Sequence, residues 1–201
     1  MNEKQAKNFF FEMNDIFNKV GLRYFLFLGT LLGAIREQRF IPIDKDFDIG
    51  VFKEEFDLKK DKLKAEFEKN GFETKWKFNN SKEEEKNNPV GLGIYKGLVE
   101  VGKKRKMHCD ICAFIKLKKW RYYPRAGKSR KVLAYLSKII GKLKDIEFYG
   151  RKVKVPFYTE KFLELTYGKD WRTPHTKFKA ESGIGSQFLP ESGNEFWWAE
   201  E

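Results

Sequence analysis

The chain has 201 residues, of which 41% are hydrophobic and 16% aromatic, so it can bury one sizeable core, and we expect a single domain over 1–201. No apolar run reaches about 18 residues and the N-terminus lacks a secretory pattern, which excludes a membrane-spanning helix and predicts a cytoplasmic protein. The 41 Lys and Arg outnumber the 29 Asp and Glu, giving a net charge of +12 that favours anionic partners, although a solvated lysine-rich surface explains the same balance.

Hydrophobic patterns along the chain predict helices and strands in alternation. Helical spacing of apolar residues predicts helices over 8–20, 31–36, 53–70, 133–143 and 159–167. Short apolar or alternating runs predict strands over 25–28, 46–51, 72–78, 90–101 and 107–115, and a strand pair over 148–155. The polar stretch 79–89 predicts a loop. We therefore expect a mixed sheet with packed helices.

The first motif is a glycine–threonine pair between a predicted strand and a predicted helix. Gly29 and Thr30 lie where that helix is expected to begin. A helix start leaves backbone N–H groups unpaired and carries a partial positive charge, so the turn can cradle a phosphate. The Thr30 hydroxyl can cap the helix or donate to the phosphate. An ordinary turn with a capped helix has the same sequence, so this motif alone does not distinguish a phosphate-binding turn from a structural one.

Two carboxylates follow on the predicted strand 46–51. Side chains alternate along a strand, so the apolar residues face the core while Asp46 and Asp48 project from the other face, about 7 Å apart at Cα. Like charges held this close repel each other, and a bound divalent cation removes that repulsion. Exposed strand carboxylates without a ligand are the alternative.

A third carboxylate, Asp110, lies in the apolar run 107–115. A charge in such a strand is usually paired or bound to metal. Three carboxylates suit Mg²⁺ or Mn²⁺, whereas the two histidines of the chain are too few for a histidine-built zinc centre. His108 is either a strand neighbour or lines the site. Cys109 and Cys112 face opposite sides of the strand, so we expect reduced thiols.

These motifs together resemble the LicD family of phosphocholine transferases, which also includes the fukutin and fukutin-related ribitol-phosphate transferases. The resemblance rests on Gly29-Thr-Leu-Leu-Gly-Ala-Ile-Arg36, on Ile41-Pro-Ile-Asp-Lys-Asp-Phe-Asp-Ile-Gly50 and on Tyr167-Gly-Lys-Asp-Trp171. The family pattern has Trp after the proline and an acidic residue between its first two aspartates. This chain has Ile43 and Lys45 there, which lowers the local negative charge.

The resemblance implies an α+β fold of the nucleotidyltransferase superfamily, with a core over about 1–174 and a C-terminal tail, 175–201, that we expect to dock on the body. It also implies roles for the residues of the site. The expected metal ligands and catalytic residues are Asp46, Asp48 and Asp110. Asp110 is either a ligand alone or also the general base. Asp44 is expected to orient either a metal-bound water or the entry of the strand, rather than to bind the metal directly. The expected phosphate-binding residues are Gly29, Thr30 and Arg36, with pairing to Glu37 as the alternative for Arg36.

The implied reaction moves phosphocholine or a polyol phosphate from a CDP-linked donor to a sugar hydroxyl, with release of CMP. The acceptor would be a glycan of the capsule, lipooligosaccharide or teichoic-acid type. Two alternatives stay open: a nucleotidylyltransferase that uses an NTP and releases pyrophosphate, and a non-catalytic basic protein that binds anions. The lysine cluster 103–106 could reach a nucleotide phosphate or an anionic acceptor, and the cluster 116–131 could face substrate or the anionic inner membrane face; nucleic acid is not an expected partner.

Overall fold

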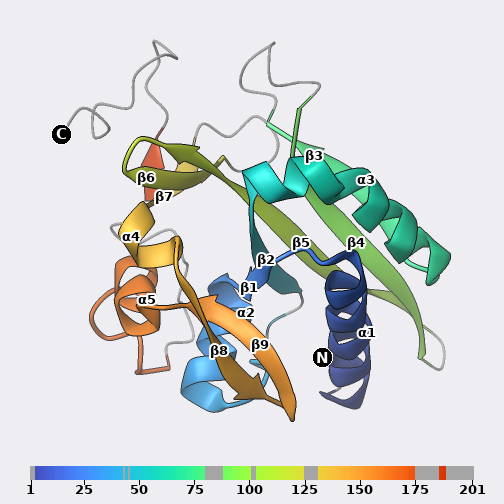
Figure 1. Cartoon of the computed structure of the whole chain (residues 1–201). Coiled ribbons are helices and arrows are strands. Elements are labelled where there is room, and N and C mark those ends of the chain that lie inside the picture. The colour runs from blue at the N-terminus through green and yellow to red at the C-terminus, as the bar shows by residue number, and fades with distance from the viewer. Residues whose placement is uncertain are drawn as a thin grey trace.

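The computed structural model describes residues 3–42, 44, 46–79, 88–100, 103–124, 131–174 and 186–188. It has the mixed α+β architecture that the sequence predicts (Figure 1). The helices are α1 (Glu3–Val20), α2 (Leu28–Leu32), the π-helix η1 (Gly33–Glu37), α3 (Lys53–Lys69), α4 (Ser137–Ile140) and α5 (Thr159–Tyr167). The strands are β1 (Tyr24–Leu26), β2 (Phe47–Phe52), β3 (Glu73–Phe78), β4 (Pro89–Glu100), β5 (Lys103–Leu117), β6 (Trp120–Pro124), β7 (Lys131–Leu136), β8 (Leu143–Phe148), β9 (Arg151–Pro156) and β10 (Ser186–Phe188).

The long strand β5 joins two parts of the main sheet. Toward its start it is antiparallel to β4, in its second half it is parallel to β2, and its last residues pair with β6. The order is therefore β3-β4-β5-β2-β1 in one part and β5-β6-β7-β10 in the other, with β8 and β9 as a separate hairpin (Figure 1). Among the described strands, β2 and β5 form the one parallel pair.

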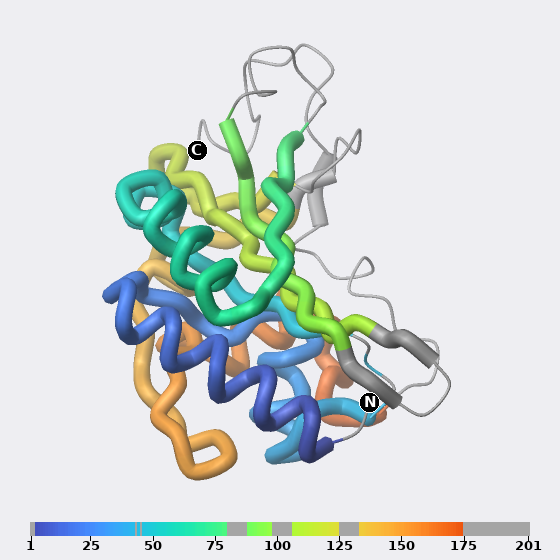
Figure 2. Tube along the Cα trace, turned by 90° about the vertical axis from the view of Figure 1, so that its right-hand side faces the viewer, coloured from blue at the N-terminus to red at the C-terminus, as the bar shows by residue number. Residues whose placement is uncertain are grey.

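Helices α1 and α3 lie side by side and cover one face of the sheet (Figure 2). The apolar residues that predict α1 are buried at helical spacing, among them Phe9, Phe10, Met13 and Phe17. The Phe9 ring stacks on Phe47 of β2, with centroids 5.3 Å apart. Because Phe47 alternates with Asp46 and Asp48 along the chain, the two helices cover the face away from the carboxylates.

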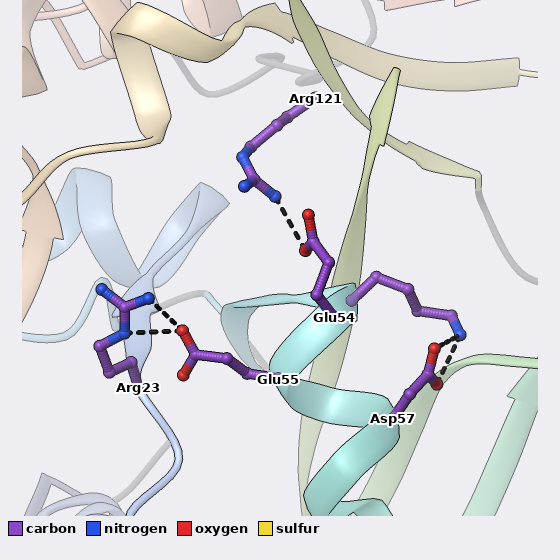
Figure 3. Close-up of polar contacts among 6 residues, drawn as sticks. Arg23, Glu54, Glu55, Asp57 and Arg121 are labelled. Atoms are coloured by element: carbon purple, nitrogen blue, oxygen red, sulfur yellow. Dashed lines mark hydrogen bonds and ion pairs between the residues drawn. The ribbon is translucent and has the colours of Figure 1, made fainter. Parts of the chain in front are cut away.

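Ion pairs connect the start of α3 to two other elements (Figure 3). Arg121 of β6 donates to Glu54 at 3.1 Å, and the Nε of Arg23, just before β1, donates to Glu55 at 2.7 Å. Both arginines also lie over the Phe52 ring, with Cζ 4.4 and 5.6 Å from its centroid. Glutamates in a first helical turn interact favourably with the helix dipole. These contacts thus fix α3 immediately after the strand that carries Asp48.

The predicted helix over 133–143 is wrong. Residues 131–136 form β7, and only the four residues of α4 are helical. The backbone of β7 pairs with β6, where Tyr123 is opposite Leu133, so sheet pairing outweighs the helical pattern of the apolar residues. The strand pair predicted over 148–155 is a longer hairpin, β8 and β9, whose turn residues Tyr149 and Gly150 both have positive φ, 52° and 75°.

Part of the predicted tail pairs with the body: β10 is antiparallel to β7. The rest of the tail, 175–185 and 189–201, lies outside the described residues, as does most of the predicted loop, 80–87. In the described ranges no helix is both long enough and apolar enough to cross a bilayer.

Candidate active site

The parallel pairing of β2 and β5 brings two of the predicted carboxylates together. Asp48 and Asp110 are direct Cα partners in the register, so their side chains leave the same face of the sheet at the strand spacing of about 4.8 Å. Of the Asp110 side chain, 20% is exposed. Two acids from distant parts of the chain therefore share one small region.

Asp46 lies just before β2 and reaches the same region through His108. The Oδ2 atom of Asp46 is 4.0 Å from His108 Nδ1, while His108 Nε2 contacts Asp110 Oδ1. This second contact is not a well-aligned hydrogen bond, since Nε2 and Oδ1 are both buried and have no hydrogen-bond partner. The imidazole stacks on the Tyr95 ring, with centroids 4.5 Å apart and planes 3° from parallel. His108 thus lines the site.

Asp44 lies against the glycine of the predicted phosphate turn. A Cβ atom added to Gly29 would be 2.1 Å from Asp44 Oδ2, so any larger residue would displace this carboxylate. A phosphate at Gly29 would therefore share the place with Asp44. The phosphate-binding role of Gly29 stays a prediction.

Thr30 positions Asp48 and does not cap a helix. Helix α2 begins at Leu28 with Phe27 as its N-cap, so Gly29 and Thr30 lie in the first turn of a helix as expected, but Thr30 as its cap is wrong. The buried Thr30 hydroxyl accepts a hydrogen bond of 2.9 Å from the backbone N–H of Asp48. This bond ties α2 to the start of β2, where the acids lie.

The Thr30 hydrogen bond gives a stability prediction. Thr30→Val keeps the shape but leaves the Asp48 N–H without its partner, so we expect a loss of about 1–2 kcal/mol in the free energy of unfolding, measured in urea. Thr30→Ser keeps the acceptor and is the control. A loss in Thr30→Ser with none in Thr30→Val would mean that the methyl group, not the hydroxyl, matters here.

Charge repulsion is concentrated on Asp48. Burial raises its pKa well above the ordinary value of 3.8, and the charges of Asp46, Asp110 and Asp44 raise it further, while Lys77 acts in the opposite direction. A divalent cation at this place would favour the charged form of Asp48. The region is thus a cluster of carboxylates in which negative charge outweighs the positive charge of Lys77.

Lys77 is a member of the site that the sequence interpretation missed. It belongs to β3, and its Nζ contacts Asp110 Oδ2. Burial alone would raise the pKa of Asp110, but the contacts from His108 and Lys77 outweigh it and hold that pKa below 3.8. The alternation of Glu73–Phe78 carries the signal for the face of Lys77, since Lys75 and Lys77 fall on one side of the strand.

Arg36 and the C-terminal motif form the layer beside the acids. The Arg36 guanidinium pairs with Glu37 at 3.0 Å and donates through Nη1 to the carbonyl of Trp171 at 3.2 Å. Trp171 is buried, and so is Tyr167, whose pKa is raised first by burial and then by the nearby charge of Asp48. Arg36 therefore connects η1 to the Tyr167–Trp171 segment, and its contact with phosphate stays a prediction.

The carboxylate oxygens of the site are ligands that a hard divalent cation prefers, but in this structure they do not converge on one point. Mg²⁺ and Mn²⁺ are such cations, and Asp110 Oδ1 is a buried oxygen without a hydrogen-bond partner. As they stand, no three His, Cys, Asp or Glu side chains of the described residues are placed to hold a metal ion together. One reason is that Asp110 already contacts Lys77 and His108.

The two cysteines are buried thiols. Cys109 and Cys112 are free and buried, and burial raises the pKa of both thiols well above 9.0. They are three positions apart on β5 and thus face opposite sides of the sheet, as predicted.

A cavity of about 340 Å³ lies elsewhere, between α1, the segment before β1 and the β8–β9 hairpin. Its lining includes Asn14, Asn18, Arg23 and Lys152 and none of the four aspartates. The chemistry of the cluster is therefore separate from this cavity.

Comparison with known proteins agrees with the motifs of the site. The family described as LicD/FKTN/FKRP, nucleotidyltransferase domain, matches residues 21–157, which is more than half of the chain and includes all four aspartates. The ribitol-5-phosphate transferase FKTN of Homo sapiens is 28% identical over 173 residues, covering 85% of this chain and 34% of the human protein. The protein of the same name from Macaca fascicularis is 29% identical over an equal span.

A shorter match is to a bacterial protein. An uncharacterized protein of Rickettsia typhi is 40% identical over 58 residues, covering 27% of this chain and 19% of that protein. The chain spans about a third of the length of the FKTN proteins that it matches. On the family match over 21–157, this chain belongs to the LicD/FKTN/FKRP nucleotidyltransferase-domain family.

Proposed function

We propose that the chain transfers a phospho-alcohol, phosphocholine or a polyol phosphate, from a CDP-linked donor to a sugar hydroxyl of a glycan and releases CMP. The observation that carries the proposal is the pairing of Asp48 with Asp110, with Asp46 and Asp44 beside them, in a member of this family. The FKTN relatives, named as ribitol-5-phosphate transferases, support a polyol phosphate as the transferred group.

In the proposed reaction the acceptor oxygen attacks the phosphorus that carries the alcohol. A new P–O bond forms, the bond from that phosphorus to the oxygen of CMP breaks, and the acceptor proton passes to a carboxylate oxygen of Asp110. Asp46, Asp48 and Asp110 would hold Mg²⁺ or Mn²⁺, with Asp44 orienting a bound water. When bound, such an ion neutralises charge on the departing phosphate. The hydrogen bond from Asp48 to Thr30 fixes one of these acids in place.

A donor screen tests the proposal. The purified chain is incubated with CDP-choline, CDP-glycerol or CDP-ribitol, a glycan acceptor and Mg²⁺, and CMP is measured. We expect CMP from one donor, and none after removal of the cation with EDTA. Pyrophosphate released from an NTP would instead support the nucleotidylyltransferase alternative. Salt-sensitive binding of anions without either product would support the non-catalytic one.

The basic clusters support a further partner. We retain the anionic face of a membrane as a proposed peripheral contact, because lysines of the predicted cluster 116–131, such as Lys118 and Lys119, are exposed. Cosedimentation with vesicles that contain anionic lipid, compared with neutral vesicles, measures this contact.

A further inference from the structure

Lys77 is held in an unusual place for a lysine. It lies on β3, two strands away from Asp110, yet its Nζ contacts Asp110 Oδ2 and only 19% of its side chain is exposed. The ion pair with Asp110 holds the ammonium group of Lys77 directly against one acid of the cluster.

Glycine on the intervening strand makes this reach feasible. Gly93 of β4 is the register partner of Asp110 on one side and of Lys75 on the other. A Cβ atom on Gly93 would be 3.3 Å from Lys77 Cε and 2.8 Å from Tyr95 Oη. A side chain at this position would therefore crowd the path of Lys77 toward the acids. The absence of a side chain at Gly93 thus leaves the space through which Lys77 reaches Asp110.

Both oxygens of Asp110 are in contact with a neighbour. Oδ2 contacts Lys77 and Oδ1 contacts His108. A divalent cation that binds Asp110 therefore has to share or displace one of these contacts. The His108 ring is held by its stack on Tyr95, whereas Lys77 has a long, flexible stem. Lys77 is thus the group that can move away.

We propose that Lys77 is the built-in counter-cation of the acidic cluster: it holds Asp110 while no divalent cation is bound, and it competes with that cation for Asp110. It is a positioning residue, since it acts through Asp110. By this competition Lys77 sets the concentration of divalent cation at which the site fills. The inference rests on the proposed function, because the cation in question is the one that the transfer reaction uses.

Titration with Mn²⁺ alone tests this inference. Free Mn²⁺ is measured by electron paramagnetic resonance in the native chain, in Lys77→Met and in Lys77→Arg. Removing the competing charge is expected to tighten Mn²⁺ binding about tenfold in Lys77→Met. An opposite charge at this distance lowers the pKa of a carboxylate by about one unit or more, and it should weaken cation binding by a similar factor. Lys77→Arg keeps the charge and should bind as weakly as the native chain. The matched control is Lys75→Met, on the same face of β3. The Lys75 side chain is exposed and its charge is screened by salt, so this variant should bind Mn²⁺ as the native chain does.

Thermal unfolding gives a second measurement that does not depend on activity. Without cation, Lys77→Met is expected to melt below the native chain, because four acids lose their counter-charge, and Mn²⁺ should restore the melting temperature. If the variant is unfolded without cation, refolding on addition of Mn²⁺ is followed by circular dichroism. Both results support the competition, whereas a variant that stays unfolded with Mn²⁺ contradicts it.

The outcomes separate this inference from the proposed function. Mn²⁺ binding in Lys77→Met that is no tighter than in the native chain overturns the inference and leaves the proposed function standing. A native chain that binds no Mn²⁺ overturns both. Lys77-dependent Mn²⁺ binding without CMP release from any donor keeps the inference and removes the function.

Discussion

Replacing Asp48 with asparagine is expected to lower CMP release about 10³-fold or more and, at the same time, to stabilise the cation-free chain. The loss follows because a central carboxylate of the proposed cation site is removed. The gain follows because Asp48 is buried and repelled by Asp46, Asp110 and Asp44. Relief of such strain at an active site is typically worth about 1 kcal/mol. Activity and urea unfolding with EDTA present are the two measurements.

The sign of this effect depends on pH. The pKa of Asp48 is raised in the folded chain, so the native protein binds that proton more tightly when folded and loses stability as pH rises toward the raised pKa. The advantage of Asp48→Asn is therefore greatest at neutral pH and disappears below the ordinary value of 3.8. Asp61→Asn, at an exposed position of α3, is the control and should change neither quantity. An active Asp48→Asn variant would exclude the proposed site.

Replacing Gly91 with alanine is expected to give the largest loss of stability, about 3 kcal/mol or more. A Cβ atom at Gly91 would be 2.1 Å from the backbone carbonyl oxygen of Ile111, which cannot turn aside as a flexible side chain could. Strands β4 and β5 would have to separate where Gly91 is opposite Cys112, two positions from Asp110. Chemical denaturation measures the loss.

Gly97→Ala is the matched control for this variant. Gly97 is on the same strand and the same face as Gly91, but a Cβ atom there meets nothing within 4 Å. Its substitution is expected to be neutral or to stabilise the fold by about 0.5 kcal/mol, because alanine restricts the unfolded chain. Equal losses in both variants would show that the clash with Ile111 does not determine the effect.

The sequence predicts the elements whose local pattern and tertiary contacts agree. The helices α1, α3 and α5 are confirmed, since one stripe of each is apolar and that stripe is buried. The helix predicted over 133–143 is wrong, because its apolar residues fit both the helical spacing and the alternation of a strand. Pairing with the neighbouring strand β6, which is not among the predicted strands, selects the strand. Pairing partners are a tertiary property, so short apolar runs do not define their own structure.

In the site, too, the local pattern predicts the face of a residue but not its partners. Alternation places Asp46 and Asp48 on one face of a strand, but nothing local states that β5 is the neighbour of β2 or that Asp110 is opposite Asp48. Lys77 could be assigned to a face but not to a partner two strands away, since its reach depends on Gly93. The structure likewise pairs Arg36 with Glu37 and Trp171, contacts that join distant segments.

Because β2 and β5 run in the same direction, no tight turn can connect them, and the chain passes through α3, β3 and β4 between the two strands. A chain that is half synthesised or partly unfolded therefore carries only scattered aspartates with little affinity for a divalent ion. If a divalent ion binds the assembled carboxylates as proposed, it should slow unfolding while leaving the folding rate almost unchanged.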